Sequence, residues 1–161
     1  MKLIRTVSIA VMVSLLGLAV VSAQDAGEKK KPTPEEKAVK GRQELMHVLA
    51  AQRGVLRDMA DGKRPTDAVA FANSANALAA LAKVIPEAFT LNAIVGKSTA
   101  KPDIWTNQAD FSKKSTELAD KAAKVATLAA TDIEGAKAMV KDIKECGGCH
   151  DAYRVEEEKK K

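Results

Sequence analysis

Aromatic residues, cysteine and histidine are all scarce in this chain of 161 residues. Aromatic side chains make up only 3% of the sequence, which disfavours an all-β fold because strands draw heavily on them. Apolar residues reach 46%, more than a disordered chain would carry, and the length is short for a multidomain enzyme. The sequence also shows no carboxylate pair, no nucleophile with a neighbouring base and no phosphate-binding loop. The composition therefore favours one alanine-rich helical domain, and we expect no enzymatic activity.

Clusters of basic residues interleaved with aromatic residues, which are typical of nucleic-acid-binding proteins, are missing too. The formal net charge is only +5, from 26 basic and 21 acidic residues. The lysine runs at residues 29–31 and 159–161 have the character of solvated chain ends. We therefore expect no nucleic-acid partner.

The first 23 residues have the pattern of a secretory signal peptide. Lys2 and Arg5 precede an uncharged stretch over residues 7–21, and small residues follow up to Ala23. The stretch is about 15 residues long, which falls short of the roughly 20 that a membrane-spanning helix needs. We expect cleavage after residue 23, export to the periplasm and a mature protein that is not embedded in a membrane. An uncleaved anchor is the alternative.

The mature chain reads as a polar tether at residues 24–33, a domain at 34–155 and a charged tail at 156–161. Apolar spacing and capping residues predict four helices, at residues 34–60, 67–85 and 107–130, and from Thr131 toward the C-terminus. Pro86 is expected to end the second helix. Residues 86–105 are expected to form a crossover loop, held down by five apolar anchors, Phe89, Leu91, Ile94, Ile104 and Trp105. The predicted fold is all-α, an antiparallel four-helix bundle.

The only two cysteines, Cys146 and Cys149, are followed directly by His150. Cys-x-x-Cys-His is the attachment pattern of c-type haem, in which both sulfurs form thioethers and the histidine ligates the iron. At about 100° per residue, the three side chains share one sector of a helix. The pattern predicts one covalently bound haem c per chain.

Three other sites use similar residues. A thioredoxin-type dithiol belongs to a βαβ scaffold, which this sequence does not predict. A structural zinc site needs four ligands, and His47 is the only further histidine. A disulfide between Cys146 and Cys149 would close a very small loop and stabilise little.

Several motifs resemble those of the class II c-type cytochromes, the cytochrome c′ family. They are Gly41-Arg42-Gln43 with Met46, Asp61-Gly62, Lys101-Pro102-Asp103-Ile104-Trp105, and the C-terminal run from Cys146 to Arg154. Gly41 departs from the family pattern, in which many relatives carry a tyrosine. The resemblance implies that haem attached to the last helix lies inside the bundle, with the first helix covering the opposite face of the iron.

The resemblance places Met46 at the distal iron position. In some relatives a methionine there is the sixth ligand of a low-spin electron carrier, whereas others leave the iron five-coordinate and bind nitric oxide or carbon monoxide. We expect ligation by Met46 and single-electron transfer, with gas binding as the alternative. An ordinary core methionine is the other interpretation of Met46. A weak peroxidase would need an open distal face with an acid–base group, which Met46 does not offer.

Two arginines are further candidates through the resemblance. Arg42 is expected to bind a haem propionate, the alternative being a solvated helix charge. Arg154 is expected to flank the proximal imidazole, the alternative being a cation favoured by the helix C-terminus. His47 is expected at the surface. The resemblance also implies redox partner proteins, diatomic gas as a ligand in some members, and a homodimer through the first two helices.

Overall fold

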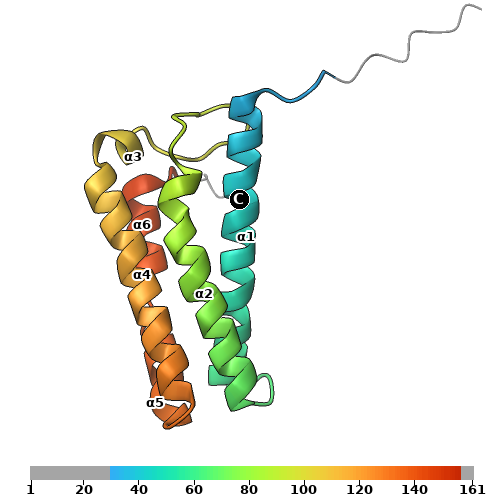
Figure 1. Ribbon diagram of the computed structural model, residues 1–161, viewed down its shortest axis with the longest axis vertical. Coiled ribbons are helices and arrows are strands. Elements are labelled where there is room, and N and C mark those ends of the chain that lie inside the picture. The colour runs from blue at the N-terminus through green and yellow to red at the C-terminus, as the bar shows by residue number, and fades with distance from the viewer. Residues whose placement is uncertain (1–29, 157–161) are drawn as a thin grey trace, which may run out of the picture. The chain divides into compact units, whose positions relative to one another are not determined.

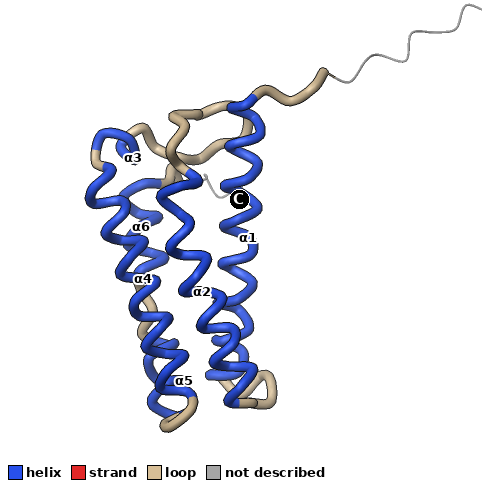
Figure 2. Tube along the Cα trace, in the orientation of Figure 1, coloured by secondary structure: helices blue, strands red, loops and turns tan. Residues whose placement is uncertain are grey.

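The computed structural model describes residues 30–156, so the expected signal peptide and most of the tether and tail lie outside the described residues. This part of the chain forms six helices joined by loops (Figures 1 and 2). They are α1 (Pro34–Ala60), α2 (Ala68–Ala88), α3 (Asp103–Thr106), α4 (Gln108–Ala129), α5 (Ile133–Lys141) and α6 (Glu145–Tyr153). The long helices alternate in direction, and α5 and α6 together take the place of the fourth helix of the bundle (Figure 1). The predicted antiparallel four-helix bundle is confirmed.

Helix α1 begins and ends where its sequence predicts. The Thr33 hydroxyl accepts a hydrogen bond from the Glu36 amide at 3.2 Å, and the Glu36 carboxylate accepts one from the Thr33 amide at 2.7 Å. This reciprocal pair satisfies amides that have no partner within the helix, and Pro34 occupies the first turn. At the other end, Gly62 has a φ of 72°, a left-handed conformation that glycine adopts without a steric penalty.

Helix α2 continues past Pro86 to Ala88, so the prediction that Pro86 ends the helix is wrong. Proline has no amide hydrogen, and the carbonyl of Ala82 therefore loses its usual partner within the helix. The hydroxyl of Ser115 on α4 donates to that carbonyl instead, and Ser115 is only 3% exposed. The neighbouring helix thus supplies the hydrogen bond that the proline removes.

The sequence predicts one continuous fourth helix, and this prediction is wrong. The chain forms two helices there, α5 and α6, with a break at residues 142–144. Asp132, not Thr131, is the N-cap of α5, since its carboxylate accepts from the Gly135 amide at 2.8 Å. At the break, Ile143 turns into the core and is 3% exposed. Gly147 and Gly148 further weaken the helix that follows, because glycine is a poor helix former.

The bundle core lies mainly between α2 and α4. One apolar face of α2 is buried, from Phe71 through Ala75 and Leu78 to Ile85. By length and composition alone, α2 is the one helix in residues 30–156 that could cross a membrane, and its buried face packs on α1 and α4.

The crossover loop is held by fewer side chains than the sequence predicts. Phe89 and Ile104 are buried, at 8% and 2% exposed, and Trp105 packs against the core. Leu91 and Ile94 are exposed, at 41% and 45%, so their expected role as anchors is wrong. Ala93 is buried in their place, because the loop turns its backbone carbonyls, rather than its larger side chains, toward α1.

Candidate functional site

A cavity of about 830 Å³ opens among α1, α2, α4, α6 and the crossover loop. Its size lies within the range of cavities that hold small ligands and cofactors. The α1 side of the cavity is built from residues three or four positions apart, which share one helical face. The residues of that stripe are Val39, Arg42, Met46, Leu49 and Arg53.

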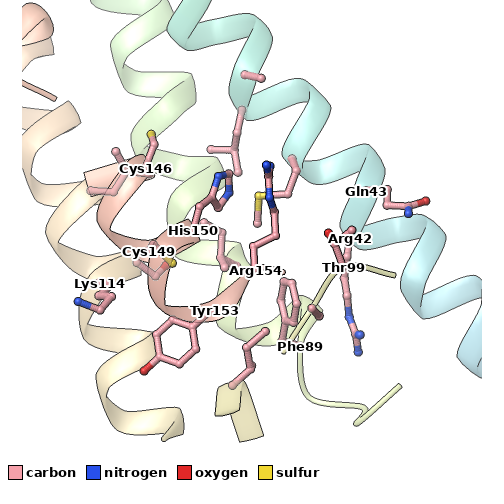
Figure 3. A pocket seen from close by; sticks show the side chains of 18 of the residues that line it. Arg42, Gln43, Phe89, Thr99, Lys114, Cys146, Cys149, His150, Tyr153 and Arg154 are labelled. Atoms are coloured by element: carbon pink, nitrogen blue, oxygen red, sulfur yellow. The ribbon is translucent and has the colours of Figure 1, made fainter. Parts of the chain in front are cut away.

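Helix α6 brings Cys146, Cys149 and His150 to the wall of this cavity (Figure 3). Both cysteines are free thiols and half-buried. Burial raises the pKa of each thiol and lowers the pKa of His150, and the charge of Arg154 lowers the latter further. Both effects favour the neutral imidazole, which is the form that ligates a metal ion.

Met46 lines the same cavity from α1. It is half-buried and packs against the edge of the core. Its neighbour His47 is exposed, as expected, and lies at the rim of the cavity. The structure thus brings the candidate distal residue and the candidate proximal residue to one space from two different helices.

Arg42 is 4% exposed, so its interpretation as a solvated charge is wrong. Its Nε donates to the carbonyl of Ala88 and its Nη1 to that of Ala93, both at 2.8 Å. Its Nη2 donates to the carbonyl of Leu91. The guanidinium also stacks on Phe89, 4.6 Å from the ring centre, and points toward the crossover loop (Figure 3).

These bonds bear on the expected propionate contact. Arginine has five N–H donors, and three of those of Arg42 bind loop carbonyls. Two N–H groups are therefore not used by these bonds, and the propionate role stays a prediction. Burial lowers the pKa of Arg42, but an arginine stays charged under ordinary conditions.

Arg154 is exposed, and its position is compatible with either of its two interpretations, so its role stays a prediction. It is the C-cap of α6, and its amide donates to the carbonyl of His150 at 2.8 Å. It also lines the cavity, close enough to His150 to lower the imidazole pKa. The backbone around Arg154 pairs with the crossover loop. The Lys101 amide donates to the carbonyl of Tyr153 at 2.9 Å, and the Val155 amide donates to the carbonyl of Thr99 at 2.8 Å.

Comparison with known proteins agrees with this geometry. Residues 37–154 match the family model described as Cytochrome C′. The chain belongs to the cytochrome c′ family. Cytochrome c-554 of Cereibacter sphaeroides is 36% identical over 124 residues, which cover 74% of this chain and 93% of that protein. Cytochrome c′ of Alcaligenes xylosoxydans xylosoxydans is 31% identical over 121 residues, which cover 74% of this chain and 94% of that protein.

Solved structures of the cytochrome c′ family share the fold. Cytochrome c prime from Shewanella frigidimarina is 33% identical, with a TM-score of 0.67, over 78% of this chain and 100% of that chain. A nitric oxide complex of a variant cytochrome c prime from Alcaligenes xylosoxidans is 29% identical, with a TM-score of 0.69, over 79% of this chain and 100% of that chain.

Cytochromes c′ carry covalently attached haem c with iron, and this chain is accordingly a haem c protein. Its cavity fits that cofactor, because two free thiols one helical turn apart open on it beside the imidazole of His150. Residues 30–156 hold no cluster of three or more His, Cys, Asp or Glu side chains that could bind a metal ion. A porphyrin fits such a site because it brings nitrogen ligands of its own.

Several lining residues of this cytochrome c′ cavity were missed from the sequence. Arg53 lies seven residues after Met46 on the same face of α1, a spacing that could have identified it. Glu145 directly precedes the haem-attachment pattern, whereas Lys114 on α4 gave no signal. Their places depend on how α1, α4 and α6 pack, which the sequence alone does not determine.

Trp105 packs as expected, and Tyr153 is a second aromatic residue that serves in packing. The Trp105 indole Nε1 donates to the carbonyl of Phe89 at 2.7 Å, which ties the crossover loop to α3. Tyr153 is buried, its ring packs edge-on against Phe111, and its hydroxyl donates to the Asp110 carboxylate at 2.7 Å. Burial, followed by this hydrogen bond to Asp110, raises the pKa of Tyr153 to about 12.

Proposed function

We propose that this chain is an exported, periplasmic electron-transfer protein with one haem c. Cys146 and Cys149 would hold the haem as thioethers, His150 would be the proximal iron ligand and Met46 the sixth ligand. The single observation that carries the proposal is that Met46 on α1 and His150 on α6 line one cavity. Bound haem c supplies an iron that gains and loses one electron.

The residues of the chain suit that task. Met46 is unbranched and half-buried, so its thioether has freedom to adjust to the iron. A histidine–methionine ligand pair raises the reduction potential, as in other c-type cytochromes. Arg42 would bind a haem propionate through its two remaining N–H groups. Arg154 would flank the proximal imidazole. We propose redox proteins as partners, and no enzymatic activity.

The ligand set is tested by replacing Met46 with alanine in the haem-loaded protein. We expect the unmodified protein to be low-spin, with the weak near-infrared band of sulfur bound to ferric iron. Met46→Ala should convert the iron to high-spin, remove that band and allow carbon monoxide to bind. Met139→Ala is the matched control, because Met139 is also half-buried but lies on α5 outside this cavity.

Binding of a diatomic gas is the second candidate function, supported by the relative whose structure is a nitric oxide complex. In that case Met46 would be a lid over five-coordinate iron and not a ligand. An unmodified protein that is already high-spin, lacks the near-infrared band and binds carbon monoxide readily would replace electron transfer with gas binding.

A further inference from the structure

Two buried polar atoms at the cavity have no hydrogen-bond partner among residues 30–156. They are Nε of Arg53 and Oε2 of Glu145. Both residues line the cavity, Arg53 from α1 and Glu145 from the first position of α6. A buried, unpaired polar group is costly, and more so when it is charged. These two atoms therefore call for a physical explanation.

The two side chains lie at the cysteine end of the cavity. Helices α1 and α6 run antiparallel (Figure 1), so Arg53, the last residue of the α1 stripe, and Glu145, the first residue of α6, lie at the same end of the cavity. In agreement with this, the charge of Arg53 lowers the pKa of the Cys146 thiol and the charge of Glu145 raises it. The two groups are complementary, since one is a donor with positive charge and the other an acceptor with negative charge. No ion pair joins them in the structure described for residues 30–156.

Half of the Glu145 carboxylate is already in use. Its Oε1 forms an ion pair with Nζ of Lys121 on α4 at 2.6 Å, and Lys121 also lies 3.8 Å from Oδ2 of Asp142. This joins α6 to α4, which is the helix on which α6 mainly packs. Helix α1 has no corresponding polar connection to α6 among the described residues, and the cavity separates the two.

Both atoms are closed off from solvent in the structure, so water does not satisfy them. Haem held by Cys146 and Cys149 would present its apolar vinyl edge at this end of the cavity and would offer these two atoms no polar partner. At the Cys146 end, Arg53 Nε–H and Glu145 Oε2 are thus left with one another as partners.

We propose that Arg53 donates a hydrogen bond to Oε2 of Glu145 in the haem-loaded protein, so that one carboxylate connects α1, α6 and α4. Arg53 is then a positioning residue. It fixes the stripe of α1 that carries Met46 against the helix that carries His150. The inference rests on haem attachment at Cys146, and it holds whether Met46 is a ligand or a lid.

The direct test is hydrogen exchange of the Arg53 Nε–H in ¹⁵N-arginine-labelled holo protein. The ferrous protein is used, with carbon monoxide added if the iron is five-coordinate, so that the sample is diamagnetic in either case. We expect the Arg53 Nε–H to exchange roughly tenfold or more slowly than that of exposed Arg57. Glu145→Met should abolish this protection. Lys121→Met, which removes the recorded ion pair but leaves Oε2 free to accept, should keep it. Exchange of the Arg53 Nε–H as fast as that of Arg57 would overturn the pair.

A second measurement covers the case in which Glu145→Met holo protein does not accumulate. We expect Arg53→Met to change the circular dichroism of the main haem absorption band, which senses the surroundings of the haem in either spin state. Arg53→Lys should restore most of that signal, and Arg57→Met should leave it unchanged. An Arg53→Met protein with the wild-type haem signal would show that Arg53 does not position the site.

Thermal unfolding of the holo protein separates pairing from two independent effects. We expect Arg53→Met and Glu145→Met each to lower the Tm. The double variant should lower it no further than the larger single change, because both substitutions remove the same Arg53–Glu145 hydrogen bond. Losses that add in the double variant would contradict the proposal. None of these readouts depends on the near-infrared band that tests Met46.

Discussion

At the scale of single residues, Arg42 shows how one buried charge holds a loop that has few apolar anchors. Its side chain spans from α1 to the carbonyls of Ala88, Leu91 and Ala93, over a segment in which Leu91 and Ile94 face solvent. Charge-assisted hydrogen bonds are stronger than neutral ones, and a loop of this length has many carbonyls to satisfy. The arginine thus supplies the anchoring of the loop that the sequence analysis expects from Leu91 and Ile94.

Replacement of Arg42 by methionine is therefore expected to destabilise the protein. Methionine keeps much of the apolar contact with Phe89 but leaves three loop carbonyls without their donor. We expect a loss on the order of 3 kcal/mol in the free energy of unfolding, measured by denaturant titration of the holo protein. Lys40→Met is the control, because Lys40 lies on the same helix and is exposed, with only a surface ion pair to Glu44. A loss for Arg42→Met no larger than that for Lys40→Met would contradict this account.

Tyr153 gives the protein a specific sensitivity to alkaline pH. Its pKa is raised to about 12 in the folded state, against about 10 in an unfolded chain. The folded state therefore holds the phenolic proton more tightly, and its contribution to stability is fully present below about pH 10 and is lost as the pH rises through about 12. Tyr153→Phe should remove this part of the pH dependence. The measurement is the free energy of unfolding of both proteins from pH 8 to 12, in which we expect the difference between them to shrink above about pH 10. A constant difference would contradict the assigned cause.

At the scale of elements, Ser115 explains how α2 continues past Pro86 to Ala88. The proline removes one donor from the helix, and the serine on α4 replaces it. The same hydrogen bond fixes the axial position of α2 against α4 near the cavity, which Ser115 also lines.

Ser115→Ala should leave the Ala82 carbonyl buried and unpaired. We expect this to cost about 1–3 kcal/mol in the free energy of unfolding. Pro86→Ala in the same chain should recover a large part of the loss, because alanine restores the backbone donor within α2. Thr116→Ala is the control, since the Thr116 hydroxyl is exposed and bonds to its own helix at Ser112. If Pro86→Ala gives no recovery, the serine does not substitute for the missing backbone donor.

The elements differ in how well their sequence predicts them. Helix α1 was predictable to the residue, because Thr33, Glu36 and Gly62 act through local hydrogen bonds and backbone conformation. The end of α2 was not, because it depends on Ser115, 29 positions from Pro86 along the chain. The break before α6 also escaped prediction, since Ile143 fits a helical pattern and leaves it only because of the core.

The residues of the candidate site also differ in how well the sequence predicts them. Cys146, Cys149 and His150 are contiguous, so their shared face follows from helix geometry alone. The bonds of Arg42 to residues about 50 positions away, and the presence of Arg53 and Glu145 in the lining of one cavity, require the tertiary packing. Local motifs therefore identified the cofactor, whereas the surroundings of the cofactor had to come from the structure.

At the scale of the whole bundle, the cavity divides the described residues into a well-packed part and a part that depends on the cofactor. Helices α2 and α4 carry most of the fully buried side chains. Helix α6 packs mainly on α4 and faces the cavity on its other side, and Tyr153 is its only buried residue. A helix of nine residues is marginal by itself, so we expect the haem to add a large part of the free energy that holds α6 in place.

The Cys146→Ser, Cys149→Ser protein, which cannot form thioethers, should therefore lose order unevenly. We expect amide hydrogens of α6 to exchange close to the rate of an open chain, whereas those of α2 and α4 stay protected for much longer. In the holo protein α6 should gain protection by a factor of 100 or more, roughly what a tightly held ligand confers on the segment that binds it. Hydrogen–deuterium exchange with mass spectrometry measures this helix by helix, with α5 as the internal control, because α5 packs on both α1 and α4 and does not line the cavity. Equal protection of α5 and α6 in the haem-free protein would mean that the bundle holds its last helix without the cofactor.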